Sequence, residues 1–131
     1  GEYTHTADEK KRISLPAKFR QELGKKIVVT RGLDSCLYLY PLKTWAAISQ
    51  ETTKLGHMQR DTRYTRFLFS GASEIEIDSI GRILIPEFLR EFADLKSAIV
   101  FTGVHDRIEI WSERRWATYK KKLILDGVGL R

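Results

Sequence analysis

Hydrophobic and polar residues alternate along residues 74–78 and again from Arg82 to Ile85. Between these segments lies a short turn-forming stretch that contains Gly81. A period of two residues is typical of a β-strand, and a glycine between two such segments is typical of a tight turn. Pro86 follows directly, and proline is common at the first position of a helix. The pattern therefore predicts a strand, a turn, a second strand and then a helix.

The same pattern occurs earlier in the chain. Three pairs of residues stand seventy positions apart: Asp8 and Asp78, Arg12 and Arg82, and Pro16 and Pro86. The correspondence continues through two further strand-like segments, 27–30 with 99–102 and 37–41 with 108–112. It ends at Trp45 and Trp116, after a drift of one position. Two copies of one small unit, each with a helix between strand pairs, are therefore predicted.

These patterns predict an α+β protein that contains two pseudo-symmetric halves. Half of a 131-residue chain would bury little apolar surface alone. We therefore expect the halves to pack together like the subunits of a dimer. The predicted divisions are 2–45 for the first repeat, 46–72 for a connecting helical segment, 73–116 for the second repeat, and 117–131 for the end of the last helix and a tail.

Composition is ordinary for a globular protein, with 42% hydrophobic and 31% charged residues. No apolar run approaches membrane-spanning length, and no signal-like segment is present, so a cytoplasmic location is expected. The single Cys36 cannot form an internal disulfide and is expected to be buried. His5 occupies an inward-facing position, and no two histidines have metal-ligand spacing. Neither a metal site nor a cofactor is therefore predicted.

The distribution of charge distinguishes the two copies. The formal net charge is +6, which suits a polyanionic partner. The first predicted turn carries Lys10, Lys11 and Arg12, whereas the second carries only Arg82. The first turn is therefore the better candidate for a phosphate-binding surface.

Both turns have the pattern of an aspartate followed four residues later by an arginine. The carboxylates of Asp8 and Asp78 can accept hydrogen bonds from backbone N–H groups two residues on, and Gly81 can adopt a positive φ. Arg82 can pair with Asp78 and lock the turn, which would give these residues an architectural role. The other interpretation is that the cations of the turn face phosphates and bases. Lys11 stands where the second copy has Gly81, at a cost of roughly 1 kcal/mol if φ is positive.

The motifs of this chain resemble those of a known family, the bacterial MraZ proteins. The resemblance covers nearly the whole chain and rests on an ordered series of segments: Gly1-Glu2-Tyr3, Asp8-x-Lys10-x-Arg12, Pro16-Ala17-Lys18-Phe19-Arg20, Thr30-Arg31-Gly32-Leu33-Asp34, Leu39-Tyr40-Pro41, Trp45, Asp78-x-x-Gly81-Arg82 and Arg107-Ile108-Glu109-Ile110-Trp111. Lys11 is a departure, because the family usually has glycine there.

The resemblance implies a fold and a function. The fold would be two tandem SpoVT-AbrB-like halves whose swapped hairpins form a small β-barrel with peripheral helices. The function would be transcriptional regulation by a ring-shaped homo-oligomer. Such rings bind short direct repeats of double-stranded DNA with a T-G-G-G core, upstream of division and cell-wall genes. A nucleoid-associated location follows from this.

In the family, the motif of the first copy faces DNA. The resemblance therefore implies that Lys10 and Arg12, which match this motif, contact DNA here. Arg12 is the predicted contact to guanine, the most common specific contact in the major groove. Lys10, Lys11 and Lys18 are expected to bind phosphates, and Arg20 is a further candidate. Asp8, Asp78, Gly81 and Arg82 are expected to hold the turns.

Three alternatives remain at this stage. Asp8 and Asp78 could form an acid-protease dyad that shares one proton, although the residues after Asp8 fit poorly. The chain could instead be an antitoxin-like module that binds a protein with its C-terminal tail. The third open question is the role of three arginines in the connecting segment, Arg60, Arg63 and Arg66. They could form a solvated helix face, a contact between subunits or additional contacts to phosphates.

Overall fold

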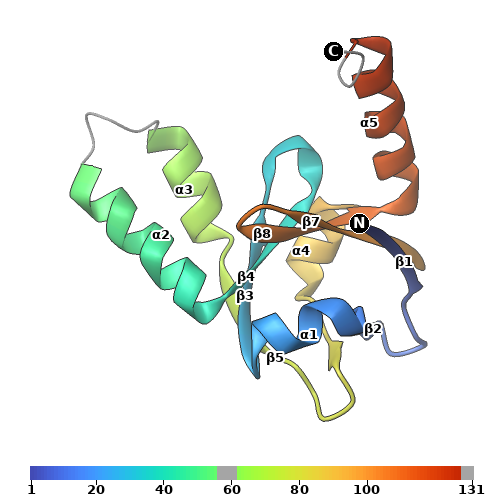
Figure 1. Ribbon diagram of the computed structural model, residues 1–131, viewed down its shortest axis with the longest axis horizontal. Coiled ribbons are helices and arrows are strands. Elements are labelled where there is room, and N and C mark those ends of the chain that lie inside the picture. The colour runs from blue at the N-terminus through green and yellow to red at the C-terminus, as the bar shows by residue number, and fades with distance from the viewer. Residues whose placement is uncertain (56–61, 128–131) are drawn as a thin grey trace.

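The computed structural model describes residues 1–55 and 62–127. Its strands are β1 (Glu2–Thr6), β2 (Ile13–Ser14), β3 (Lys26–Arg31), β4 (Leu37–Pro41), β5 (Ser73–Glu76), β6 (Arg82–Ile83), β7 (Ala98–Val104) and β8 (Arg107–Ser112). Its helices are α1 (Ala17–Leu23), α2 (Leu42–Leu55), α3 (Thr62–Ser70), α4 (Glu87–Phe92) and α5 (Glu113–Leu125), with a 3-10 turn at Leu33–Ser35. The order of elements follows the predicted repeat (Figure 1).

The two short helices begin one residue after their prolines, and not at the prolines as predicted. Pro16 and Pro86 have ψ angles of 136° and 144°, so they are N-cap residues and not the first helical residues. Ser112 is the N-cap of α5, because its hydroxyl accepts a hydrogen bond from the backbone N–H of Arg115 at 3.1 Å.

The strands exchange partners between the two halves. The main sheet has six strands in the order β1-β7-β8-β4-β3-β5, and all its pairs are antiparallel. β1 of the first half pairs with β7 of the second, and β5 of the second half pairs with β3 of the first. The strands on either side of each turn therefore do not form simple local hairpins.

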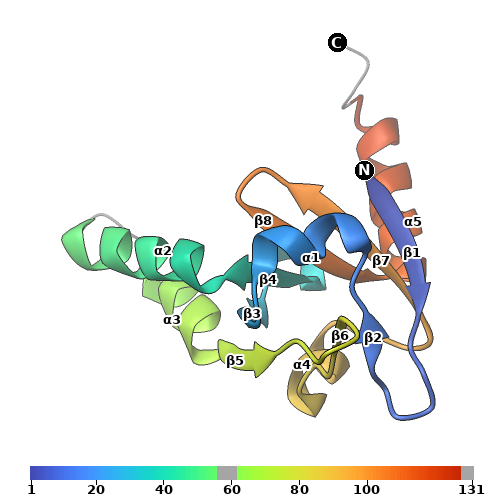
Figure 2. The ribbon, with the colours of Figure 1, turned by 60° about the horizontal axis from the view of Figure 1, so that its bottom comes forward.

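The short strands β2 and β6 form a separate two-stranded sheet, in which Ile13 faces Ile83 (Figure 2). The predicted closed barrel is not confirmed. β1 and β5 are the two edges of the main sheet and do not pair with each other, so this sheet is open.

One hydrophobic core joins the two halves. Corresponding residues of both repeats meet in it: Ile13, Leu15, Phe19 and Leu23 from the first, and Ile83, Ile85, Leu89 and Ala93 from the second. The core is completed by one face of the main sheet, which includes the fully buried Phe101. The expectation that the halves pack like a dimer is confirmed.

The opposite face of the sheet carries a second, aromatic cluster. Tyr38, Tyr40 and Trp111 on the strands belong to it. Tyr40 packs against Trp45 of α2, and Trp111 packs against Trp116 of α5. Cys36 is buried in this cluster, as expected, and burial raises the pKa of its thiol. His5 packs edge-on against Phe101, with ring centroids 5.7 Å apart, in the structural role expected for it.

The connecting segment contains the predicted helix, α3, which is tied to β3. The Arg31 guanidinium donates to the carbonyl of Phe67 and lies over its ring, 4.8 Å from the centroid. Arg63 and Arg66 are on α3, whereas Arg60 lies outside the described residues, as do tail residues 128–131. No helix in the described part of the chain is long and apolar enough to cross a membrane.

Candidate nucleic-acid interface

The first turn, residues 7–12, is closed by hydrogen bonds to Asp8. The backbone N–H of Asp8 donates to the Arg12 carbonyl at 2.9 Å, and the N–H of Lys11 donates to the Asp8 carbonyl at 3.0 Å. The Asp8 Oδ1 atom accepts from the N–H groups of Lys10 and Arg12, both at 2.9 Å. Arg12 Nε donates to the other carboxylate oxygen, Oδ2, at 3.1 Å. One aspartate thus fixes both the backbone of the turn and the arginine that leaves it.

The second turn, residues 77–82, reproduces these bonds. Asp78 Oδ1 accepts from the N–H groups of Ile80 at 3.1 Å and Arg82 at 2.8 Å. Arg82 Nε donates to Asp78 Oδ2 at 2.9 Å. The architectural pairing proposed for Asp78 and Arg82 is present, and each turn has the same internal support.

The two turns meet where β2 pairs with β6. Ser14 faces Arg82 in this pairing, and Arg82 Nη1 lies 3.6 Å from Asp8 Oδ2. Asp8 Oδ2 is therefore shared by the arginines of both copies. The arrangement couples the position of the first turn to that of the second.

Both carboxylates are stabilised in their charged form. The hydrogen bond from the Arg12 backbone N–H is the main cause that lowers the pKa of Asp8, and the Arg82 N–H does the same for the pKa of Asp78. Each aspartate is bound by an arginine and by backbone N–H groups, and the pKa of both is lowered, whereas an acid-protease dyad requires one carboxyl with a raised pKa. Among residues 1–55 and 62–127, no three His, Cys, Asp or Glu side chains gather as metal ligands.

The lowered pKa values predict a loss of stability in acid. A carboxylate whose pKa is lower in the folded state stabilises the fold above its unfolded pKa, near 4, and this contribution disappears as the pH falls through the folded pKa. The variant Asp8→Asn/Asp78→Asn should therefore be less stable than wild type at about pH 6 and approach it at about pH 3. Urea unfolding of both proteins across this range measures the difference. A gap that stays constant with pH would contradict this prediction.

The predicted phosphate-binding lysines are on the surface. Lys10 and Lys11 are exposed in the first turn, and Lys18 is exposed on α1. None of the three forms an ion pair with another described residue. Lys11 has a φ of 67°, which matches the φ of 83° at Gly81. The turn thus keeps its glycine-like conformation although it carries a lysine.

Arg20, predicted to be a DNA contact, has a structural bond that the sequence did not indicate. Its Nε donates to the carbonyl of Leu15 at 2.8 Å. Its guanidinium lies against the second turn, where a Cβ added to Gly81 would be 2.4 Å from the Arg20 Nε and Cζ atoms. Gly81 therefore suits this position for two reasons, its positive φ and the close approach of Arg20.

Arg90 is the repeat counterpart of Arg20, but it lacks the corresponding bond. The Arg90 Nε atom is buried and has no hydrogen-bond partner among the described residues. The repeat relation predicts that Arg90 faces Lys11 as Arg20 faces Gly81. On this interpretation the Cβ of Lys11 takes the space that glycine leaves to Arg20, and Arg90 is left without the corresponding bond.

Replacement of Lys11 by glycine should therefore stabilise the fold. A non-glycine residue at positive φ costs about 1–2 kcal/mol, and removal of its Cβ lets Arg90 approach the turn. We expect Lys11→Gly to raise the free energy of unfolding by about 1 kcal/mol in urea titrations. The control is Lys11→Ala, which removes the charge but keeps the Cβ. Equal stability of the two variants would show that neither φ nor the Cβ matters.

The contrast in charge between the two turns extends to the residues that replace the cations of the first copy. The positions of Lys10 and Lys18 are occupied in the second half by Ile80 and Phe88. Segment 3–23 carries five Lys or Arg and three Asp or Glu. Segment 73–93 carries only two Lys or Arg, but five Asp or Glu. A position-by-position comparison of the copies could have revealed this contrast.

Comparison with known proteins places this geometry in a family. The profile described as "MraZ protein, putative antitoxin-like" matches twice, over residues 1–67 and 68–126. The chain is 51% identical over 120 residues to a protein of Moorella thermoacetica, a match that covers 91% of this chain and 84% of the relative. The chain belongs to the MraZ family. The two matches to the MraZ profile also confirm the internal repeat.

Other MraZ relatives are similar over most of their length. The Caldicellulosiruptor saccharolyticus protein is 51% identical over 88% of this chain and 82% of its own. The Clostridium acetobutylicum protein is 44% identical over 95% of this chain and 88% of its own. All three relatives are named "Transcriptional regulator MraZ".

Proposed function

We propose that this MraZ protein is a transcriptional regulator that binds DNA through its first turn. One observation carries the proposal. Two turns with the same hydrogen bonds differ in what they expose: the first displays Lys10, Lys11 and Lys18, whereas the second displays apolar side chains at the matching positions 80 and 88. The shared bonds account for folding, so the cations of the first copy are left for a partner.

The chemistry of these lysines suits the phosphate backbone. An exposed ammonium group with no carboxylate partner can bind a phosphate and release condensed counterions. The names of the relatives assign them to transcriptional regulation, which fits a DNA partner in the nucleoid. Arg20 retains its terminal nitrogens for a further phosphate contact, since only its Nε is bonded to Leu15.

Arg12 is proposed to read guanine. Asp8 holds its Nε, so a two-pronged contact to O6 and N7 would use the two terminal nitrogens. An arginine held in advance loses less conformational entropy on binding than a free one. The guanine-rich T-G-G-G core of the direct repeats that the family resemblance implies suits such a reader.

One turn is a small footprint, so binding to a single box should be weak. A homo-oligomeric ring that presents several first turns to spaced direct repeats would gain from a high effective concentration. The proposed regulator is therefore an oligomer bound to several boxes upstream of division and cell-wall genes.

The salt dependence of binding tests the role of the lysines. Loss of one phosphate contact reduces the slope of log K against log salt by about 0.9. Lys10→Ala/Lys18→Ala should therefore reduce the slope by about 1.8 per subunit bound in fluorescence anisotropy titrations. The matched control is Lys43→Ala/Arg66→Ala, which removes two exposed cations from α2 and α3. An equal loss in the control would contradict the assignment to the first turn and favour contacts from the connecting segment.

A further inference from the structure

The second turn carries an exposed apolar surface in place of the cations of the first. Ile80, Leu84 and Phe88 are 58%, 53% and 47% exposed, and we call these three residues the second-turn patch. They lie at the tip of the turn, directly after β6, and on the first turn of α4. Their counterparts in the first half are the polar Lys10, Ser14 and Lys18. Polar residues fit the same local fold, so the apolar side chains are not needed for it.

The rim of this patch is acidic on the side of α4, whereas the Arg20 guanidinium lies on the side of the turn, against Gly81. Glu87 and Glu91 are exposed on α4, beside Phe88. These two glutamates would repel phosphates, so the α4 side of the patch does not suit DNA. An apolar centre with an acidic rim suits a protein surface that is apolar and basic.

The chain itself contains such a surface at the end of α5. Ile124 and Leu125 are 58% and 77% exposed, and the exposed Lys121 and Lys122 directly precede Leu123. We call Lys121, Lys122, Ile124 and Leu125 the α5 end. The α5 end is both apolar and basic, which is the character expected of a partner of the second-turn patch.

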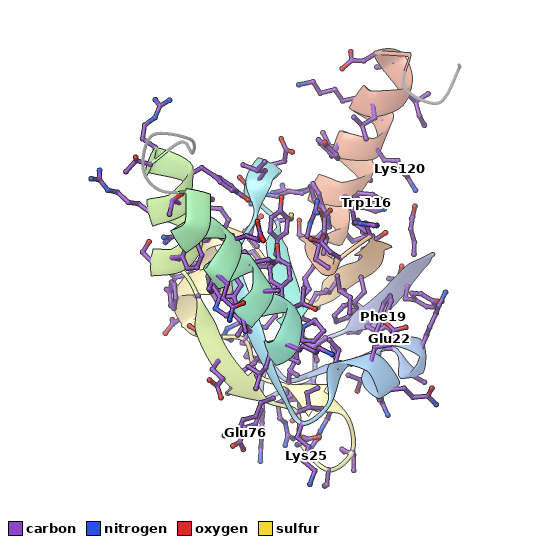
Figure 3. All side chains as sticks on the ribbon, turned by 60° about the vertical axis from the view of Figure 1, so that its left-hand side comes forward. Phe19, Glu22, Lys25, Glu76, Trp116 and Lys120 are labelled. Atoms are coloured by element: carbon purple, nitrogen blue, oxygen red, sulfur yellow. The ribbon has the colours of Figure 1, made fainter. Side chains whose placement is uncertain are left out.

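The first half of α5 is fixed to its own sheet, so the helix has a defined direction. Trp116 Nε1 donates to Glu2 Oε1 at 2.9 Å, and Lys120 Nζ lies 3.2 Å from the same carboxylate. Trp116 also packs against Trp111, with ring centroids 5.2 Å apart. Figure 3 labels Trp116 and Lys120 on this part of the helix, beyond which the α5 end projects away from the sheet.

The two surfaces cannot meet within one subunit. The α5 end and the second turn lie at opposite ends of the molecule in Figure 1 and are also well separated in Figure 2. We propose that the α5 end of one copy docks on the second-turn patch of the next. Contact between two different surfaces is head-to-tail, and repetition of such a contact closes a ring when the rotation permits. This inference rests on the self-assembly included in the proposed function and assigns the surfaces that carry it.

The first test removes the apolar character of the patch. The variant Ile80→Gln/Leu84→Ser/Phe88→Gln places polar residues where the first half already has them, so the fold should be kept, as circular dichroism can verify. Sedimentation velocity across a protein dilution series should show that assembly is weakened by at least about tenfold. The matched control is Leu33→Gln, which removes an exposed leucine, 53% exposed, from outside both surfaces. An unchanged assembly of the triple variant would overturn the inference.

The second test reverses charges on each side of the contact. Lys121→Glu/Lys122→Glu and Glu87→Lys/Glu91→Lys should each weaken assembly, and their combination in one chain should restore it. Failure of the combined variant to recover, while both parents are weakened, would contradict direct contact between these surfaces.

Binding to a duplex with one box separates this inference from the DNA proposal. The neutral triple variant should bind one box as wild type does, because the first turn is unchanged. A wild type that assembles but does not bind the box would contradict the DNA proposal and leave the docking result intact. A wild type that binds the box but stays monomeric at all concentrations would overturn the docking inference and the self-assembly on which it rests, and would leave the DNA contact of the first turn intact.

Discussion

Alanine at position 12 should remove most of the sequence-specific DNA binding. A two-pronged arginine contact to guanine contributes about 1–3 kcal/mol, so Arg12→Ala should weaken binding to one box roughly ten- to hundredfold. Binding to a scrambled duplex should change little, because the phosphate-binding lysines of the first turn remain. Anisotropy titrations with both duplexes measure the loss of discrimination.

The second turn supplies the matched control for this prediction. Arg82 makes the same Nε bond to Asp78 that Arg12 makes to Asp8, and it also approaches Asp8. Arg82→Ala therefore removes at least as much structural support, but it leaves Arg12 in place. If Arg82→Ala lost discrimination as severely as Arg12→Ala, the effect would come from turn structure and not from base recognition.

The largest loss of stability is expected at Phe101. This side chain is fully buried where β7 lies between β1 and β8, and it is opposite Tyr3 of the first half. Its truncation would leave a cavity in the core that the two halves share. Phe101→Ala should cost about 3–5 kcal/mol of the free energy of unfolding, a large part of the total for a domain of this size.

Urea unfolding at a fixed protein concentration measures this cost. Leu33→Ala is the control, because an exposed leucine should contribute less than about 0.5 kcal/mol. Single transitions in both proteins would show that the halves unfold together. Two transitions in Phe101→Ala, with the first-half signal unchanged, would contradict the shared core.

The alternation of residues predicted which segments become strands, but not how they pair. Residues 3–7 and 12–15 have the pattern of a hairpin, yet β1 pairs with β7 and β2 with β6. Alternation reports which face of a strand is buried, and both pairings bury the same face. The choice of partner depends on the other half of the chain, which local periodicity does not describe.

The candidate site was predicted to different extents. The bonds of Asp8 and Asp78 to their arginines follow from spacing alone, because four residues around a turn bring the groups together. The contact of Arg20 with Gly81 joins the two halves and has no local signal. The unpartnered Arg90 Nε likewise has no local signal in the sequence.

In the proposed function, several first turns of one oligomer bind several boxes together. The direct measurement is an anisotropy titration of wild-type protein with duplexes that carry one, two or four T-G-G-G boxes, at two salt concentrations. Affinity should rise steeply with the number of boxes and fall with salt. Equal binding of scrambled duplexes of the same length would contradict it.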